Sequence, residues 1–190
     1  MDFSKYLKKL QFDAKSDKNI DIEKQVVEFC HGIDFSDPEN IAEAENYIAE
    51  FINDKLGRNV QVTREEAKLA HLLATKMALY DKGYGDTRVI YRPKKKDEAS
   101  VGAYYDPTTR SLTFFDDNVC HPRYLLNPYG KSIEQGAHSR MHEFNHQLFV
   151  INHEVQHVCQ FGKTTDDPTN LTSLDFQIQK QHTAIDFLGQ

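Results

Sequence analysis

The chain has 190 residues, of which 39% are hydrophobic and 27% charged, a composition typical of a globular protein with one domain, or one domain and a small extension. Its net charge of −6 argues against nonspecific nucleic-acid binding, because neutralising phosphates requires a basic surface. No apolar run approaches the roughly 18 residues that a membrane span needs, and the first residues lack the apolar core of a signal peptide. Three cysteines far apart in the sequence argue against a disulfide framework. We therefore expect a cytoplasmic protein that binds neither nucleic acid nor a membrane.

Residues 1–60 are predicted to form a helical extension to a domain over residues 61–190. Apolar and charged residues alternate at helical spacing over residues 20–30. A second helix is expected over residues 38–57, with Asp37 as its N-cap and a proline at its first position. Nothing in this region indicates catalysis, and we interpret it as a packing layer or a docking surface.

The middle of the chain predicts one helix and a small sheet. Thr63 and Glu66 have the spacing of a capping box, and the helix that they begin is expected to end near Gly83. The apolar period then changes to two, which predicts strands. These cover residues 88–91, 101–105 and 111–115, the last two forming a hairpin around residues 106–109.

The pattern H-E-x-x-H occurs twice in the second half of the chain, at residues 142–146 and 153–157. On a helix the two histidines of such a motif lie one turn apart and reach one cation, while the glutamate between them can hold a water. A helix over residues 136–160 would place five histidines within an arc of about 100°. These are His138, His142, His146, His153 and His157.

The flanking residues favour the second copy as a metal site. Residues 153–157 are flanked by uncharged residues, as expected for a helix that runs through a core, whereas Arg140 precedes the first copy closely. The first copy is then interpreted as a polar helix face that lines the approach to the site. A second metal ion bound by residues 142–146 is the alternative.

The order helix, strand, hairpin, loop, H-E-x-x-H helix, loop and further helix resembles the minimal core of zincin metallopeptidases of the gluzincin type, over residues 63–190. The resemblance implies an α+β fold in which a small antiparallel or mixed sheet packs on the active-site helix and on a following helix, expected over residues 171–188. It also implies a peptide or protein substrate that pairs with an edge strand of the sheet. Residues 101–105 or 112–115 would supply that strand.

The same resemblance implies a Zn²⁺ cofactor and a set of site residues. His153 and His157 would bind the metal, and Glu154 would act as the general base toward a water that the metal activates. Oxyanion stabilisation is left open among four residues. These are Tyr104, Tyr105, Tyr124 and His121.

The third ligand departs from the family pattern, in which a glutamate of the following helix binds the metal. No glutamate follows Glu154 in this chain, but His182 and Asp186 reproduce the spacing of the family's ligand and of the aspartate that follows it. We therefore expect His153, His157 and His182 as the ligands, and three imidazoles leave a fourth position for water. The alternatives for the third ligand are Asp175, Asp166 and Asp167.

Two functions other than hydrolysis are compatible with these residues. A chain that lacks the third ligand would be a degenerate zincin fold that serves as a binding or scaffold protein. A chain that uses both copies of the motif would be a histidine-rich metal-binding protein.

Overall fold

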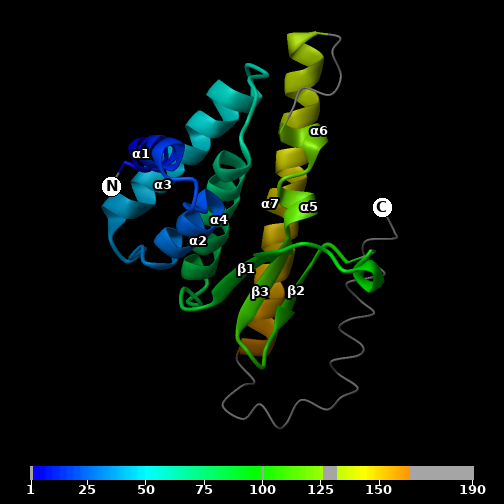
Figure 1. Ribbon diagram of the computed structural model, residues 1–190. Coiled ribbons are helices and arrows are strands. Elements are labelled where there is room, and N and C mark those ends of the chain that lie inside the picture. The colour runs from blue at the N-terminus through cyan, green and yellow to red at the C-terminus, as the bar shows by residue number, and fades with distance from the viewer. Residues whose placement is uncertain (1, 100, 126–131, 163–190) are drawn as a thin grey trace.

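The computed structural model describes residues 2–99, 101–125 and 132–162, and it has an α+β architecture in which helices predominate (Figure 1). The predicted fold class and the small mixed sheet are confirmed. The predicted loop after residue 162 and the helix over residues 171–188 lie outside the described residues. The boundary between residues 60 and 61 stays a prediction. Among the described helices, none combines the length and apolarity needed to cross a membrane.

Four helices and a short π-helix precede the sheet, and their starts follow the capping rules. The elements are α1 (Phe3–Ser16), α2 (Ile22–His31), α3 (Pro38–Glu50), the π-helix η1 (Phe51–Leu56) and α4 (Arg64–Asp81). The Asp37 carboxylate accepts the N–H of Glu39 at 2.9 Å. Thr63 and Glu66 form the predicted capping box, with each side chain accepting the backbone N–H of the other residue.

The N-terminal helices bury aromatic side chains between them. The ring of Phe3 contacts the rings of Phe29 and Tyr47 at centroid distances of 6.0 and 6.4 Å. Val26 and Cys30 of α2 are fully buried, in the layer that α2 forms with α4. One cluster of buried apolar residues extends from these helices to the sheet and to the last described helix.

The sheet has three strands in the order β1-β3-β2. They are β1 (Arg88–Arg92), β2 (Ala103–Asp106) and β3 (Ser111–Phe115). The predicted hairpin is present, because β2 and β3 pair antiparallel, and β1 pairs with β3 in parallel. Since β3 is the central strand, the expectation that residues 112–115 could supply the edge strand was wrong.

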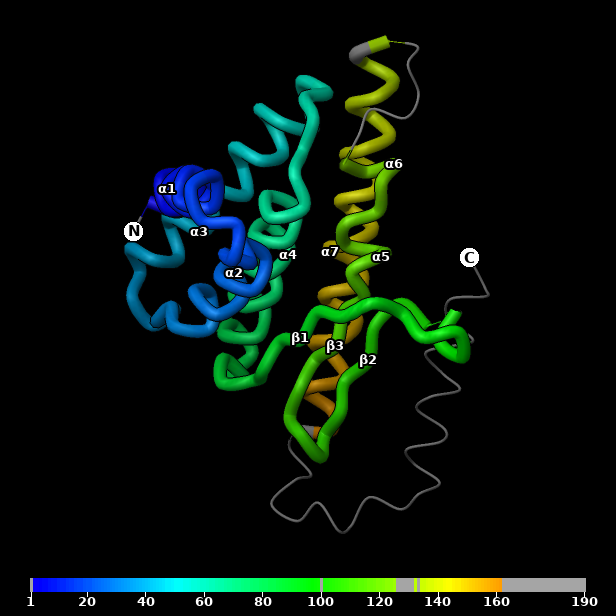
Figure 2. The backbone as a smooth tube through the Cα atoms, in the orientation of Figure 1, coloured from blue at the N-terminus to red at the C-terminus, as the bar shows by residue number. Residues whose placement is uncertain are grey.

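The two edges of the sheet have different neighbours. At the β1 edge, the imidazole Nε2 of His31 in α2 lies 3.0 Å from the carbonyl oxygen of Val89. The β2 edge contacts α7 (Ile133–Gly162), and the sheet lies in front of the C-terminal half of that helix (Figure 2). The short helices α5 (Asp116–Val119), α6 (Pro122–Leu125) and η2 (Lys96–Glu98) fall in segments for which no helix was predicted.

Helix α7 has 30 residues and packs against both α4 and β2. A buried stripe follows it at alternating spacings of three and four residues, which keeps one side of a helix facing its neighbours. The stripe consists of Ala137, Arg140, Phe144, Gln147, Ile151, Glu154 and Val158. Three of these are polar, namely Arg140, Gln147 and Glu154.

Arg140 is the largest of the fully buried side chains and ties three segments together. Its guanidinium donates to the carbonyl oxygens of Tyr124 at 2.8 Å and Leu125 at 3.2 Å, and also to that of Val60. A further N–H lies 3.3 Å from the side-chain oxygen of Asn59. The sequence suggested a charge near a possible metal, whereas the structure places this guanidinium in the packing between α7, α6 and the segment that precedes α4.

Replacing Arg140 with Met should destabilise the protein by about 3 kcal/mol, because several buried carbonyl oxygens would lose their donor. Chemical denaturation measures the change, and Arg123→Met, at an exposed position preceding the same segment, provides the matched control. Equal unfolding free energies for the two variants would contradict the structural role of Arg140.

His71 is a buried histidine of α4 that the sequence analysis did not single out. Its side chain is 1% exposed, its Nδ1 lies 2.8 Å from the Tyr91 hydroxyl, and its Nε2 has no hydrogen-bond partner in the described part of the chain. Burial, with a smaller contribution from the positive charge of Lys68, lowers the pKa of His71 to about 3.

This depressed pKa predicts a loss of stability in acid. The unfolded chain binds a proton near pH 6.5 and the folded protein does not, so the contribution of His71 is present above pH 6.5 and lost as the pH falls toward 3. The unfolding free energy of the wild type should therefore fall relative to that of His71→Gln, by at most about 1.4 kcal/mol per pH unit. Denaturation curves between pH 4 and 8 test this. The exposed His138→Gln should keep the wild-type slope.

Candidate metal centre

The second H-E-x-x-H copy brings two imidazoles into contact on α7. The Nε2 atoms of His153 and His157 lie 3.0 Å apart, with ring centroids at 4.6 Å and ring planes at 89°. A tetrahedral zinc site with bonds of 2.0–2.1 Å separates two ligand nitrogens by about 3.3–3.4 Å. The observed pair needs to open by only a few tenths of an ångström, so its geometry fits two ligands of one zinc ion.

Glu154 lies on the side of α7 that faces the rest of the protein. It is 2% exposed, and its Oε2 has no hydrogen-bond partner in the described part of the chain. Around the helix axis it lies about 60° from His157 and about 60° from Ile151, between the histidines and the core. Burial alone raises the pKa of Glu154 to about 8. A carboxyl group in this state can exchange a proton near neutral pH.

The exposure of the five histidines follows their angle from the buried stripe. His138 and His142, the farthest from it around the helix, are exposed, while His146, His153 and His157 are half-buried. The five histidines therefore lie on one face of α7, and the half-buried ones form the part of that face that lies against the protein. That part contains both histidines of the second copy.

The two copies of the motif have different surroundings. In the first copy His142 is exposed, and Glu143 is half-buried and accepts a hydrogen bond from Gln147 at 3.4 Å. In the second copy the corresponding glutamate, Glu154, is fully buried. The two copies therefore differ in the burial of their glutamate, and the choice between them as a metal site stays a prediction.

The pairing register determines which backbone groups β2 presents at its outer side. The Arg88 N–H donates to the carbonyl oxygen of Arg110 at 3.1 Å, so every second residue of β3 from Arg110 onward directs its backbone groups toward β1. Thr113 falls between these residues and pairs with Tyr104. The residues on either side of Tyr104, Ala103 and Tyr105, therefore direct N–H and C=O groups away from β3, and both residues are buried.

The structure separates the four predicted oxyanion donors. The Tyr104 hydroxyl lies 3.3 Å from the guanidinium of Arg92, and the Tyr124 ring stacks on Phe144, about 13 Å along the helix from His153. His121 is exposed. Tyr105 is buried in β2, which contacts α7, and it stays a candidate.

The predicted third ligand, His182, lies outside the described residues, as do its alternatives Asp175, Asp166 and Asp167. Within residues 2–99, 101–125 and 132–162, no group of three or more His, Cys, Asp or Glu side chains is arranged to hold a metal ion. Comparison of the chain with protein-family models, curated proteins and solved structures gives no match. The zincin resemblance and the complete ligand set therefore stay predictions.

Sequence reasoning missed one polar neighbour of the site. The Nδ1 of His157 lies 3.2 Å from the side-chain oxygen of Gln160, three residues farther along the helix. The sequence signal was available, because residues three apart on a helix are neighbours, but a glutamine after the motif is not itself a ligand pattern.

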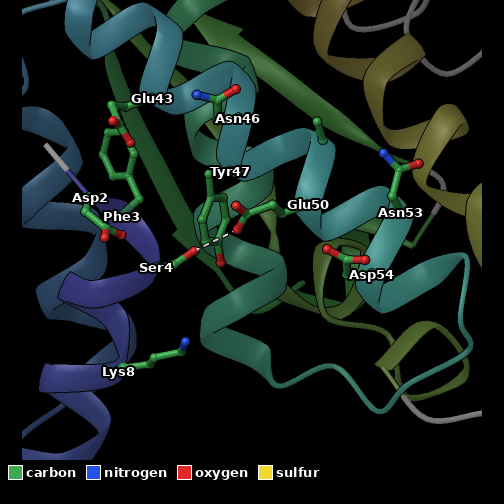
Figure 3. A pocket seen from close by; sticks show the side chains of 11 residues that line it. Asp2, Phe3, Ser4, Lys8, Glu43, Asn46, Tyr47, Glu50, Asn53 and Asp54 are labelled. Atoms are coloured by element: carbon green, nitrogen blue, oxygen red, sulfur yellow. Dashed lines mark hydrogen bonds between the residues drawn. The ribbon is translucent and has the colours of Figure 1, made fainter.

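A hollow lies between α1 and α3, and its lining differs in chemistry from the site on α7 (Figure 3). It encloses about 490 Å³ and includes the carboxylates of Asp2, Glu43, Glu50 and Asp54 in its lining. The Ser4 hydroxyl donates to Glu50 at 3.2 Å. Because its lining contains neither histidine nor cysteine, this hollow offers no nitrogen ligand like the imidazoles of α7.

The raised pKa of Glu154 predicts a pH dependence of opposite sign to that of His71. The folded protein keeps the Glu154 proton up to pH about 8, while the unfolded chain releases it near pH 4.5, so this contribution to stability is fully present below pH 4.5 and is lost as the pH rises to 8. In metal-free protein, the wild type should lose unfolding free energy relative to Glu154→Gln across this range. Denaturation in the presence of a chelator measures it, with the exposed Glu134→Gln as control. Parallel curves for wild type and Glu154→Gln would contradict the burial of this carboxyl group.

Proposed function

We propose that the chain is a zinc-dependent metallopeptidase in which His153 and His157 bind the metal, Glu154 is the general base and His182 is the third ligand. One observation carries the proposal. Two imidazole Nε2 atoms converge at 3.0 Å next to a buried carboxyl group that has no hydrogen-bond partner on Oε2 in the described residues and a pKa raised to about 8.

The energetic cost of Glu154 supports a chemical role for this residue. A buried carboxyl oxygen without a hydrogen-bond partner, such as Oε2 of Glu154 within the described residues, costs about 1–3 kcal/mol. Gln147 and Arg140 occupy the same buried stripe but have hydrogen-bond partners. A strongly perturbed carboxyl group beside potential metal ligands is a typical property of catalytic sites.

The proposed mechanism assigns each step to a group of this chain. A zinc ion held by the two Nε2 atoms would supply Lewis-acid polarisation of a water and of the substrate carbonyl. The ionised Glu154 carboxylate accepts a proton from the attacking water and then donates it to the nitrogen of the leaving amine. Burial keeps bulk water away from this carboxyl group, and the helix holds it in place.

The edge strand β2 supports a peptide as the substrate. Its outward N–H and C=O groups flank Tyr104, and the strand contacts α7, so an extended peptide that pairs with β2 would pass along the side of the helix. Ala103 and Tyr105, which carry these outward groups, are buried, so pairing with a peptide would require this edge to be uncovered.

Glu154→Gln should bind zinc like the wild type and lose hydrolysis by about 100-fold to 10,000-fold, because it removes only the proton acceptor. Cleavage of denatured casein and metal content by mass spectrometry are the measurements. Glu143→Gln is the matched control, since it makes the same change in the first copy of the motif. Hydrolysis that survives Glu154→Gln, or that is lost in Glu143→Gln, would refute the assignment.

Metal stoichiometry separates this proposal from its rivals. One zinc per chain that is lost in His153→Ala and kept in His142→Ala supports the proposed centre. Two metals per chain would favour a histidine-rich protein that uses both copies. Absence of metal from protein prepared with zinc would favour a degenerate fold without catalysis.

A further inference from the structure

The hydrogen bond between Gln160 and His157 determines which nitrogen of that imidazole carries the proton. The side-chain oxygen of Gln160 lies 3.2 Å from Nδ1 of His157. An amide oxygen accepts hydrogen bonds and cannot donate them, so Nδ1 carries the hydrogen. A neutral imidazole has one N–H group, and Nε2 of His157 therefore presents its lone pair.

The contact between the two histidines then determines the tautomer of His153. Because Nε2 of His157 has no hydrogen, the 3.0 Å contact requires His153 to donate from its own Nε2. The two imidazoles are thus in different tautomers in the metal-free protein. His157 is ready to bind a metal through Nε2, whereas His153 must first transfer its Nε2 proton.

The last turn of α7 also restricts the orientation of the His157 ring. Gln160 follows it by three residues and Phe161 by four, and both positions are neighbours on the helix surface. The Phe161 ring lies 6.4 Å from the imidazole, with an interplanar angle of 37°. The imidazole therefore has an amide oxygen at Nδ1 and an aromatic ring nearby.

We propose that Gln160 is a positioning residue for the metal centre, which holds His157 in the tautomer that binds a metal through Nε2. This inference rests on the proposed function, because it requires that His157 is a ligand. Metal-bound histidines generally donate their other N–H to a carboxylate, a carbonyl or water, and loss of such a partner weakens metal binding. An amide oxygen fulfils this role without adding negative charge to the site.

The tautomer can be measured without any metal. In ¹⁵N-labelled, metal-free protein at pH 8.5, the ring-nitrogen shifts of His157 should show a protonated Nδ1. Gln160→Met keeps the side-chain length and removes the acceptor, so the Nε2-protonated form should become the major one. Gln160→Glu restores an acceptor and should restore the wild-type tautomer. Gln156→Met is the matched control, since this exposed glutamine also follows a histidine by three residues.

Zinc affinity provides the second measurement. Competition with a chromophoric chelator should show about tenfold weaker binding for Gln160→Met, with wild-type affinity for Gln156→Met and recovery in Gln160→Glu. An unchanged tautomer or an unchanged affinity in Gln160→Met, with zinc bound normally by the wild type, would overturn the role of Gln160 and leave the proposed function standing. A wild-type protein that binds no zinc would overturn both.

Discussion

The packing of α7 along α4 and β2 is the constraint on which the candidate site depends. Alternating spacings of three and four residues place the buried stripe on one side of the helix, and this fixes the rotation of the helix about its axis. Arg140 holds one end through three backbone carbonyls, while Ile151 and Val158 are buried near the other. With this rotation fixed, Glu154 lies inside and the two histidines of its motif lie at the flank. A rotation of about 100° that turned Glu154 toward the histidine face would expose it.

Arg140 and Glu154 are both ionisable residues in one buried stripe, and the difference between them separates a structural role from a proposed chemical one. Arg140 makes the hydrogen bonds that its guanidinium requires, so its burial connects segments of the fold. Glu154 has an Oε2 without a hydrogen-bond partner in the described residues and a pKa raised to about 8. Burial of such a group in apolar surroundings lowers the stability of the folded protein. A metal-assisted reaction at the adjacent histidines would account for that loss.

Local sequence signals predicted the elements that local interactions form. The Asp37 N-cap and the Thr63 capping box act within one helical turn, and the hairpin requires pairing across a short turn. The parallel pairing of β1 with β3 was not predicted, because the strands that pair are separated by β2 in the sequence. The burial of Arg140 and Glu154 was also missed, since hydrophobic periodicity assigns charged residues to the surface. Spacing singled out His153 and His157 as candidates, but the hydrogen bond of Gln160 became evident only from the side-chain positions.

The two edges of the sheet connect the fold to the proposed chemistry. At the β1 edge the imidazole Nε2 of His31 lies within hydrogen-bond distance of the Val89 carbonyl oxygen, and α2 lies beside the strand. At the β2 edge the outward backbone groups alternate with Tyr104, and the strand contacts the helix that bears His153 and Glu154. Addition of an extended peptide to a sheet requires free N–H and C=O groups in a row. Of the two edges, β2 is the one whose strand contacts α7, but its outward groups belong to the buried residues Ala103 and Tyr105, so a peptide could pair there only if this edge were uncovered.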